Sequence, residues 1–220
     1  MLRELKTNRV KGVVFDLDGT LIDSKSDILS AFSYAFENLG KEKPEDDVLI
    51  HTIGARLEEC FRPFLGDDEN LLKDAALLFR IHYEKHFLDN TIPFEGVESL
   101  LKNLSNKYLL AVATMKKGYY ARKVIDNFNW DRYFKSVVGA EEGLKAKPDP
   151  EMLEKAISNL SLTKEEVIYI GDTEIDFLTA RNCGVDFIYV NWGYGKLNGK
   201  FEKMLTVKKP LEILSLKNSF

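Results

Sequence analysis

The sequence predicts an α/β protein: a doubly wound parallel-sheet (Rossmann-like) core with an inserted α-helical segment. From Glu95 onward, short apolar runs typical of buried strands alternate with helical segments, and repeated βα units of this length imply parallel strands with right-handed crossovers. Between Leu21 and Thr91 the apolar spacing is helical, with no clear strand. The 220 residues, 45% of them hydrophobic, suffice for such a core with a smaller insertion.

The first strand is expected at Val13–Phe15, a β-branched and aromatic run that ends where two carboxylates begin to alternate. Asp16 and Asp18 therefore lie at the carboxyl end of a strand, the edge where open α/β sheets bind ligands. Side chains at i and i+2 of an extended chain point the same way, and paired carboxylates suit a divalent cation or acid/base work. The competing interpretation is a plain hairpin turn at Asp18-Gly19, without chemistry.

The insertion should begin with a helix that Asp23 or Ser24 caps and Gly40 ends. Three further helical segments are expected at 44–53, 55–65 and 67–88. We therefore predict a core of residues 1–21 and 92–220, a helical insertion of residues 22–91, and hinges at 21–24 and 91–95.

The core should continue with alternating helices and strands. Asp149-Pro150 supplies an expected N-cap and first helical residue, and Gly184 ends a later helix. The expected strands are 108–113, 136–138, 167–170 and 187–190, and the expected helices are 97–104, 118–128, 149–160, 174–183 and one around Leu211, Ile213 and Leu214.

Two further polar residues stand next to these predicted strands and helices, at the same edge of the sheet as Asp16. Thr114 comes directly after a predicted strand, where its hydroxyl could donate to a phosphoryl oxygen, although a threonine there is often a cap or solvated. Lys147 stands directly before a helix, where an ammonium would stabilise an anionic oxygen. Most lysines are solvated, and charge alone would favour Lys145 equally, but the prolines beside Lys147 stiffen its backbone.

A second pair of acids follows the apolar strand at 167–170. Asp172 and Asp176, at i and i+4 of a helix start, would share one face, where they repel each other unless a cation lies near. The alternative is that Asp172 simply caps the helix.

The composition argues against nucleic acid and membrane as binding partners. A net charge of −4 gives no basic field for nucleic acid, and no stretch approaches the ~20 apolar residues of a membrane span. The first residues contain no apolar leader, so we expect a cytoplasmic protein, a monomer or homodimer acting on a small molecule. Cys60 and Cys183 indicate neither a disulfide framework nor a metal site and are expected to fill the core.

In this order, the polar residues resemble the four signatures of the haloacid dehalogenase-like hydrolase superfamily. These are Asp16-x-Asp18-Gly19-Thr20, Thr114, Lys147, and Asp172 with Asp176. Lys147-Pro148-x-Pro150 and Gly171-Asp172-Thr173 are similar to the phosphoglycolate phosphatase-like branch, and the insertion resembles its C1 cap. One residue departs from that pattern: Met115 stands where the branch commonly has asparagine.

The resemblance implies a Mg²⁺-dependent phosphatase for a small phosphorylated metabolite, phosphoglycolate-like or a sugar phosphate. Asp16 would be the nucleophile that forms an aspartyl-phosphate, and Asp18 the acid and base. Thr114 and Lys147 would hold phosphoryl oxygens, with Gly19, Thr20 and Met115 also near the substrate. The metal ligands would be Asp16, the backbone carbonyl of Asp18 and Asp172, with Asp176 in the outer shell or bound through water.

Other functions stay open on this fold. A sugar-phosphate mutase of the β-phosphoglucomutase kind uses the same nucleophile, and the cap would decide between the two. A hydrolytic dehalogenase needs no metal and lacks the second acid, so Asp18 speaks against it. A non-catalytic binding protein is the third alternative.

Specificity is expected to come from the cap, at Ile53–Leu57. Gly54 permits a tight turn there, and Arg56 begins a helix. Its planar fork suits a carboxylate or a second phosphate, which favours a small acidic phosphoester. A solvated helical arginine is the alternative.

Overall fold

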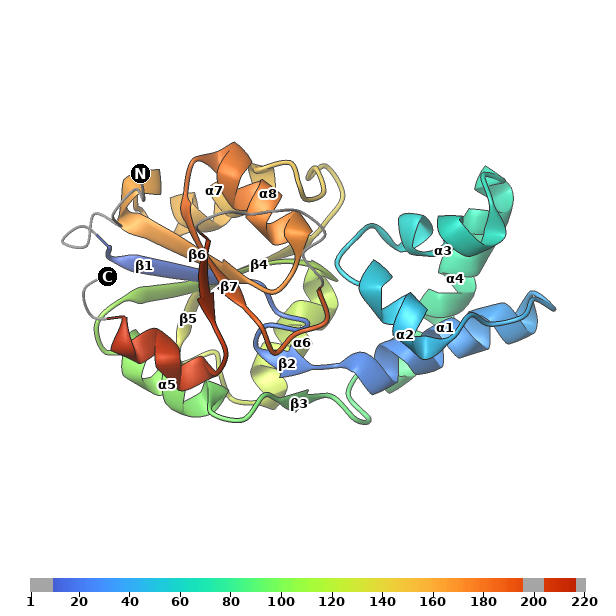
Figure 1. Cartoon of the computed structure of the whole chain (residues 1–220), viewed down its shortest axis with the longest axis horizontal. Coiled ribbons are helices and arrows are strands. Elements are labelled where there is room, and N and C mark those ends of the chain that lie inside the picture. The colour runs from blue at the N-terminus through green and yellow to red at the C-terminus, as the bar shows by residue number, and fades with distance from the viewer. Residues whose placement is uncertain (1–9, 196–203, 217–220) are drawn as a thin grey trace.

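The computed structural model describes residues 10–195 and 204–216. They form a six-stranded parallel sheet covered by helices on both faces, with a separate group of helices at one end (Figure 1). The predicted fold class, an α/β Rossmann-like architecture, is confirmed. The strand order is β5-β4-β1-β6-β7-β8, formed by Gly12–Phe15 (β1), Leu109–Lys117 (β4), Phe134–Ala140 (β5), Val167–Gly171 (β6), Asp186–Val190 (β7) and Leu205–Val207 (β8).

Strand β1 lies in the middle of the sheet and is buried along its whole length. It pairs in parallel with β4 on one side and β6 on the other, so that Phe15 lies between Val112 and Ile170. The carboxyl ends of these three strands therefore meet at one edge of the sheet. That edge faces the separate helices in Figure 1.

Helices α5 (Val97–Ser105) and α6 (Gly118–Asn127) cover one face of the sheet, and α7 (Glu151–Asn159) and α8 (Glu174–Cys183) cover the other. Each face has its own apolar cluster. One includes Phe15 and Trp130, and the other includes Val14 and Tyr169. Because β1 alternates its side chains between both clusters, neither of its faces meets water.

The insertion consists of α1 (Lys25–Asn38), α2 (Asp46–Leu49), α3 (Leu57–Leu65), α4 (Glu69–His86) and the 3₁₀ turn η1 (Ile50–Thr52). These helices have a core of their own, in which the Phe32 ring meets Phe61 and Phe79 edge to face at 4.9 and 5.0 Å. Two short antiparallel strands, β2 (Ile22–Asp23) and β3 (Ile92–Pro93), join the insertion to the sheet. They coincide with the expected hinges.

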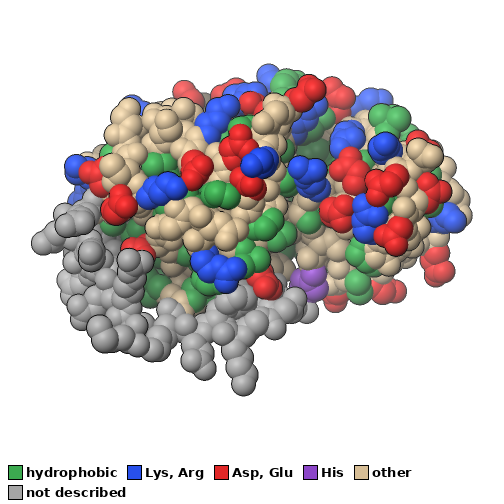
Figure 2. All heavy atoms as spheres, turned by 90° about the horizontal axis from the view of Figure 1, so that it is seen from above, with side chains coloured by type: hydrophobic (Ala, Val, Ile, Leu, Met, Phe, Trp, Pro, Cys, Tyr) green, Lys and Arg blue, Asp and Glu red, His purple; other side chains and the backbone are tan. Residues whose placement is uncertain are grey.

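The division into a core of residues 1–21 and 92–220 and a cap of residues 22–91 stays a prediction, supported by the separate apolar cluster of the insertion. The predicted core includes residues 1–9, 196–203 and 217–220, which lie outside the described part of the chain. Within that part, no helix combines the length and apolar character that a membrane crossing requires. Charged side chains of both signs are interspersed over the face seen in Figure 2.

Several predicted boundaries were wrong. The prediction missed β2, because two residues carry too little pattern, and β8, which the turn-rich end of the chain obscures. Helix α7 begins at Glu151, and its N-cap is Pro150 and not Asp149 as predicted; Asp149 Oδ1 accepts a hydrogen bond from the Glu151 N–H at 3.1 Å. The final element is a 3₁₀ helix, η3 (Pro210–Ser215). Cys60 and Cys183 are free and buried, as expected.

Candidate active site

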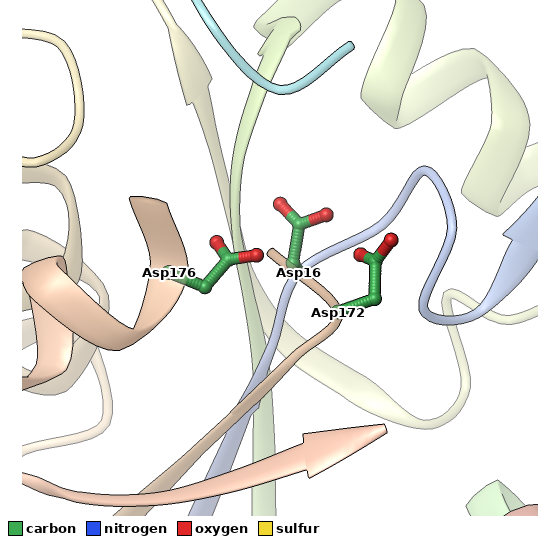
Figure 3. Close-up of side chains that lie close together, drawn as sticks. All are labelled: Asp16, Asp172 and Asp176. Atoms are coloured by element: carbon green, nitrogen blue, oxygen red, sulfur yellow. The ribbon is translucent and has the colours of Figure 1, made fainter. Parts of the chain in front are cut away.

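The polar residues singled out in the sequence converge on the carboxyl edge of the sheet. Asp16 follows β1, Asp172 follows β6, and Asp176 lies in the first turn of α8, so that their carboxylates lie side by side in Figure 3. One oxygen from each of these buried carboxylates lies within 4.8 Å of the others. Thr114 lies near the end of β4, where the pairing with β5 shifts register after Ala113. A parallel sheet thus brings together residues that are far apart in the sequence.

Lys147 lies among these carboxylates. Its Nζ donates to Asp16 Oδ1 and to Asp176 Oδ1, both at 2.7 Å, and also bonds the Tyr169 hydroxyl. Its side chain is 1% exposed, whereas that of Lys145 is 72% exposed and pairs with Asp149 at 3.5 Å. The structure therefore places Lys147, and not Lys145, in the cluster.

The charges of this cluster do not cancel. Three ionised carboxylates around one ammonium leave two negative charges in a buried site, which costs much free energy without a further cation. Burial, together with Asp176, raises the pKa of Asp172 to about 7. Burial also raises the pKa of Asp16 well above its usual value, while Lys147 opposes this rise. An all-oxygen donor set with two uncompensated charges fits Mg²⁺.

Asp172 is held by donors from two distant loops. Thr20 Oγ1 donates to its Oδ1 at 2.9 Å, and the backbone N–H groups of Tyr194 and Gly195 donate to its Oδ2 at 2.8 and 3.3 Å. A Cβ at Gly193 would lie 2.3 Å from Asp172 Oδ2, so only glycine allows this approach. Sequence reasoning assigned no chemistry to residues 192–195, although the two glycines around Tyr194 were a usable signal.

Asp176 is occupied by hydrogen bonds on both oxygens. Oδ1 accepts from Lys147 and from the Tyr169 hydroxyl (2.8 Å), and Oδ2 accepts from the side chain and backbone of Thr173 at 2.6 and 3.2 Å. The N-cap of α8 is Thr173, three residues before Asp176, and not Asp172; with Asp176, Thr173 forms a capping box. The alternative that Asp172 serves as the helix cap is therefore wrong. These bonds leave Asp176 suited to orient the cluster from outside a metal's first shell.

Asp18 has a separate environment. Its Oδ1 accepts from Ser24 Oγ at 2.6 Å and from Lys116 Nζ at 2.7 Å. Lys116 also donates to the hydroxyl of Tyr83, which belongs to α4 of the insertion. Burial lowers the pKa of Lys116, but the charges and hydrogen bonds of Asp18 and Tyr83 together outweigh burial and raise this pKa above its usual value. Sequence analysis missed Lys116.

A cavity of about 810 Å³ lies between the sheet edge and the insertion. Asp16, Asp18 and Thr114 line it on the sheet side, and the segment Ile53–Leu57 lines it on the side of the insertion. Thr114 Oγ1 accepts a hydrogen bond from the Lys116 N–H at 3.2 Å, which leaves the hydroxyl hydrogen free to donate.

The expected substrate-binding residues differ in their placement. Met115 and Arg56 line the cavity, and Arg56 is the exposed N-cap residue of α3. Within residues 10–195 and 204–216 the structure records no hydrogen bond or ion pair for the Arg56 side chain. Gly19 and Thr20 lie beside Asp172, where the Thr20 hydroxyl is already engaged. Their roles toward a substrate stay predictions.

Comparison with known proteins agrees with this geometry. The family model described as "Haloacid dehalogenase-like hydrolase" matches residues 13–190. A 5'-nucleotidase from Pseudomonas aeruginosa is 33% identical over 189 residues, 85% of each chain. A phosphoglycolate phosphatase from Aquifex aeolicus is 30% identical over 205 residues, 93% of this chain and 95% of that protein.

The fold has close solved counterparts. A haloacid dehalogenase-like family hydrolase from Streptococcus pneumoniae superposes with a TM-score of 0.87 at 28% identity, over 94% of this chain and 98% of the other. The match with the family, the phosphatase relatives and the converging signature residues lead to one conclusion. This chain belongs to the haloacid dehalogenase-like hydrolases, on the branch that resembles phosphoglycolate phosphatases.

Proposed function

We propose that the protein is a Mg²⁺-dependent phosphatase that hydrolyses the phosphate monoester of a small metabolite through an aspartyl-phosphate. One observation carries the proposal: the buried cluster of Asp16, Asp172, Asp176 and Lys147 reaches, through Asp16, a cavity that Asp18 also lines. This arrangement offers a nucleophile, an acid and a site for positive charge within one pocket.

Asp16 is the nucleophile. Lys147 fixes its Oδ1, whereas Oδ2 has no recorded partner among the described residues, and Asp16 lines the cavity. Oδ2 attacks phosphorus in line, a bond from phosphorus to Oδ2 forms, and the bond to the ester oxygen breaks. Thr114 donates to one of the remaining phosphoryl oxygens. The positive charge of Lys147, whose three hydrogens bond Asp16, Asp176 and Tyr169 in this structure, stabilises the negative charge that spreads over these oxygens.

Asp18 transfers the protons. It protonates the departing ester oxygen, which leaves as an alcohol, and then takes a proton from the water that attacks the aspartyl-phosphate. Hydrolysis returns Asp16 as a carboxylate and releases inorganic phosphate. Two carboxylates in different surroundings thus take two roles, since Asp16 belongs to the Lys147 cluster and Asp18 to the Lys116 contact.

The metal would be held by Asp16, Asp172 and the backbone carbonyl of Asp18, with Asp176 supporting it from outside. When bound, Mg²⁺ supplies positive charge that offsets repulsion between the nucleophilic carboxylate and the phosphate dianion. Asp172, with no cationic side chain among its recorded partners, is the residue that most needs this charge.

The substrate class follows from the cavity and the relatives. We infer a small phosphoester that carries a second anionic group, because Arg56 lines the cavity and has no recorded hydrogen bond or ion pair among the described residues. The relatives named 5'-nucleotidase and phosphoglycolate phosphatase support a phosphatase over a mutase. The cytoplasmic location and the monomeric or homodimeric state remain predictions from the sequence.

The test is a panel of phosphorylated metabolites with Mg²⁺, including phosphoglycolate, sugar phosphates, nucleoside monophosphates and pyrophosphate, assayed for released phosphate. Asp16→Asn should abolish turnover on every ester and form no trappable phospho-enzyme. Asp126→Asn, an exposed site on α6, is the matched control and should behave as wild type. Substantial activity in Asp16→Asn, or transfer of phosphate to a sugar without its release, would contradict the proposal.

A further inference from the structure

The Lys116 ammonium joins two parts of the molecule. It lies in β4 of the sheet, donates to Asp18 Oδ1 at 2.7 Å, and donates to the hydroxyl of Tyr83 on α4 of the insertion. Its side chain is 3% exposed, so these two partners replace the water that an exposed ammonium would have. A chain of hydrogen bonds therefore runs from the insertion to the proposed acid.

We propose that Lys116 and Tyr83 are a positioning pair that aims the carboxyl group of Asp18 at the ester oxygen while the insertion lies over the sheet. The inference rests on the proposed function, because it assigns the pair to the proton transfer that Asp18 performs. Neither residue touches the phosphoryl group in this scheme; both act through Asp18.

The hydrogen bonds on Asp18 fix its orientation. Oδ1 accepts from both Ser24 and Lys116, at 2.6 and 2.7 Å, and Oδ2 has no recorded partner among the described residues. Ser24 is the N-cap residue of α1, where the chain enters the insertion. With Oδ1 held from two sides, Oδ2 is the oxygen left for a proton transfer in the cavity.

The position of Tyr83 is itself fixed by packing. Its ring stacks on Phe79 at 5.3 Å, meets Tyr120 of α6 at a right angle at 5.5 Å, and lies under the Lys116 ammonium, 5.0 Å from the ring centroid. The side chain is nearly buried. Because α4 carries the hydroxyl, displacement of the insertion removes one of the two ligands of the ammonium and loosens its hold on Asp18.

Tyr83→Phe tests this with the ring packing kept. The loss of one hydrogen bond to a charged group should lower kcat about tenfold on phosphoglycolate, whose alkoxide leaving group needs a proton. On 4-nitrophenyl phosphate, whose leaving group needs none, kcat should change less than about twofold, and KM should stay the same for both. Tyr119→Phe removes an exposed hydroxyl on α6 and serves as the control.

A double-mutant cycle checks that the two residues act as a unit. Lys116→Met should show a larger kcat loss with the same dependence on the leaving group, and adding Tyr83→Phe should lower kcat no further. Lys123→Met, an exposed lysine on α6, is its control, and thermal melting establishes that each variant folds.

Three results would overturn the inference. They are equal losses on both esters, a change in KM alone, or additive losses in the double variant. In each of these cases the proposed function stands as long as Asp16→Asn is inactive. If the wild-type protein hydrolyses no ester of the metabolite panel and no 4-nitrophenyl phosphate, the proposed function fails, and this inference fails with it.

Discussion

Two buried lysines occupy similar positions on either side of the candidate site. Lys147 and Lys116 each donate at 2.7 Å to one of the two proposed catalytic aspartates, and each also bonds a tyrosine hydroxyl. Each ammonium lies over the ring of that tyrosine, 5.2 Å from Tyr169 and 5.0 Å from Tyr83. The difference lies in where the partners come from.

All recorded partners of Lys147 belong to the sheet and its helices, whereas Lys116 has one partner on the sheet side and one on the insertion. The position of the proposed nucleophile, Asp16, should therefore depend only on the sheet and its helices. The position of the proposed acid, Asp18, should depend on the insertion as well. Attack on phosphorus and protonation of the leaving group thus depend on different contacts: those of Lys147 within the sheet and its helices, and those of Lys116 with both the sheet side and the insertion.

The largest expected effect is that of Lys147→Met. Removing this ammonium leaves Asp16 and Asp176 without their shared cation in a buried site, which should cost about 3 kcal/mol or more of unfolding free energy in metal-free protein. Activity should fall at least about a thousandfold, since both the nucleophile and the phosphoryl oxygens lose a contact. Urea unfolding and steady-state kinetics measure the two losses.

Lys116→Met is the matched variant for this comparison. It also removes a buried ammonium, but from a single carboxylate that keeps its bond to Ser24, so both losses should be smaller. If the two variants lose stability and activity to the same degree, the distinction drawn between the two sides of the site is wrong.

The next effect concerns the metal and its dependence on pH. The pKa of Asp172 is raised in the folded protein from 3.8 to about 7, chiefly by burial. A carboxyl group with a raised folded pKa stabilises the fold below its unfolded pKa, and that contribution is lost as the pH rises from about 4 to 7. Ionisation of Asp172 should therefore make the melting temperature of the metal-free protein lower at pH 8 than at pH 5.5.

Mg²⁺ should reverse that trend, because it binds the ionised carboxylates and competes with the proton. The rise in melting temperature on adding Mg²⁺ should be larger at pH 8 than at pH 6, and EDTA should abolish both the shift and the turnover. Asp172→Asn, which removes the titrating group, should flatten the pH dependence. A shift that is independent of pH, or full activity in EDTA, would exclude the carboxylate cluster as the metal site.

The same comparison shows which features could be predicted from sequence. Lys147 could be found because it precedes a helix within a stiff Lys-Pro-x-Pro segment, and Asp16 and Asp172 because each ends an apolar strand. Parallel pairing then brings those strand ends together, whatever the details of packing. The fold class and the core of the candidate site follow from these local signals.

Lys116 and Tyr194 carried no comparable signal. Lys116 lies within a register shift of β4, between Ala113 and Lys117, that no sequence pattern indicates, and Tyr83 has the helical spacing of an ordinary core residue of the insertion. Tyr194 holds Asp172 through a backbone N–H, which every non-proline residue possesses. Contacts between the sheet and the insertion depend on how their distinct apolar clusters are placed relative to each other, and periodicity describes each cluster only by itself.

The smallest expected effect belongs to Arg56, whose guanidinium is exposed and contacts the substrate's second anion only in the proposed complex. Arg56→Ala should raise KM for an acidic phosphoester such as phosphoglycolate about tenfold, the value of one charge-assisted hydrogen bond near solvent, and leave kcat nearly unchanged. Hydrolysis of 4-nitrophenyl phosphate, which has no second anion, should not change. Arg62→Ala on the same helix, where the arginine pairs with Glu59, Asp67 and Glu69, controls for loss of surface charge. Equal changes on both substrates, or the same change in Arg62→Ala, would remove Arg56 from substrate recognition and leave the specificity of the cap to other residues of the cavity.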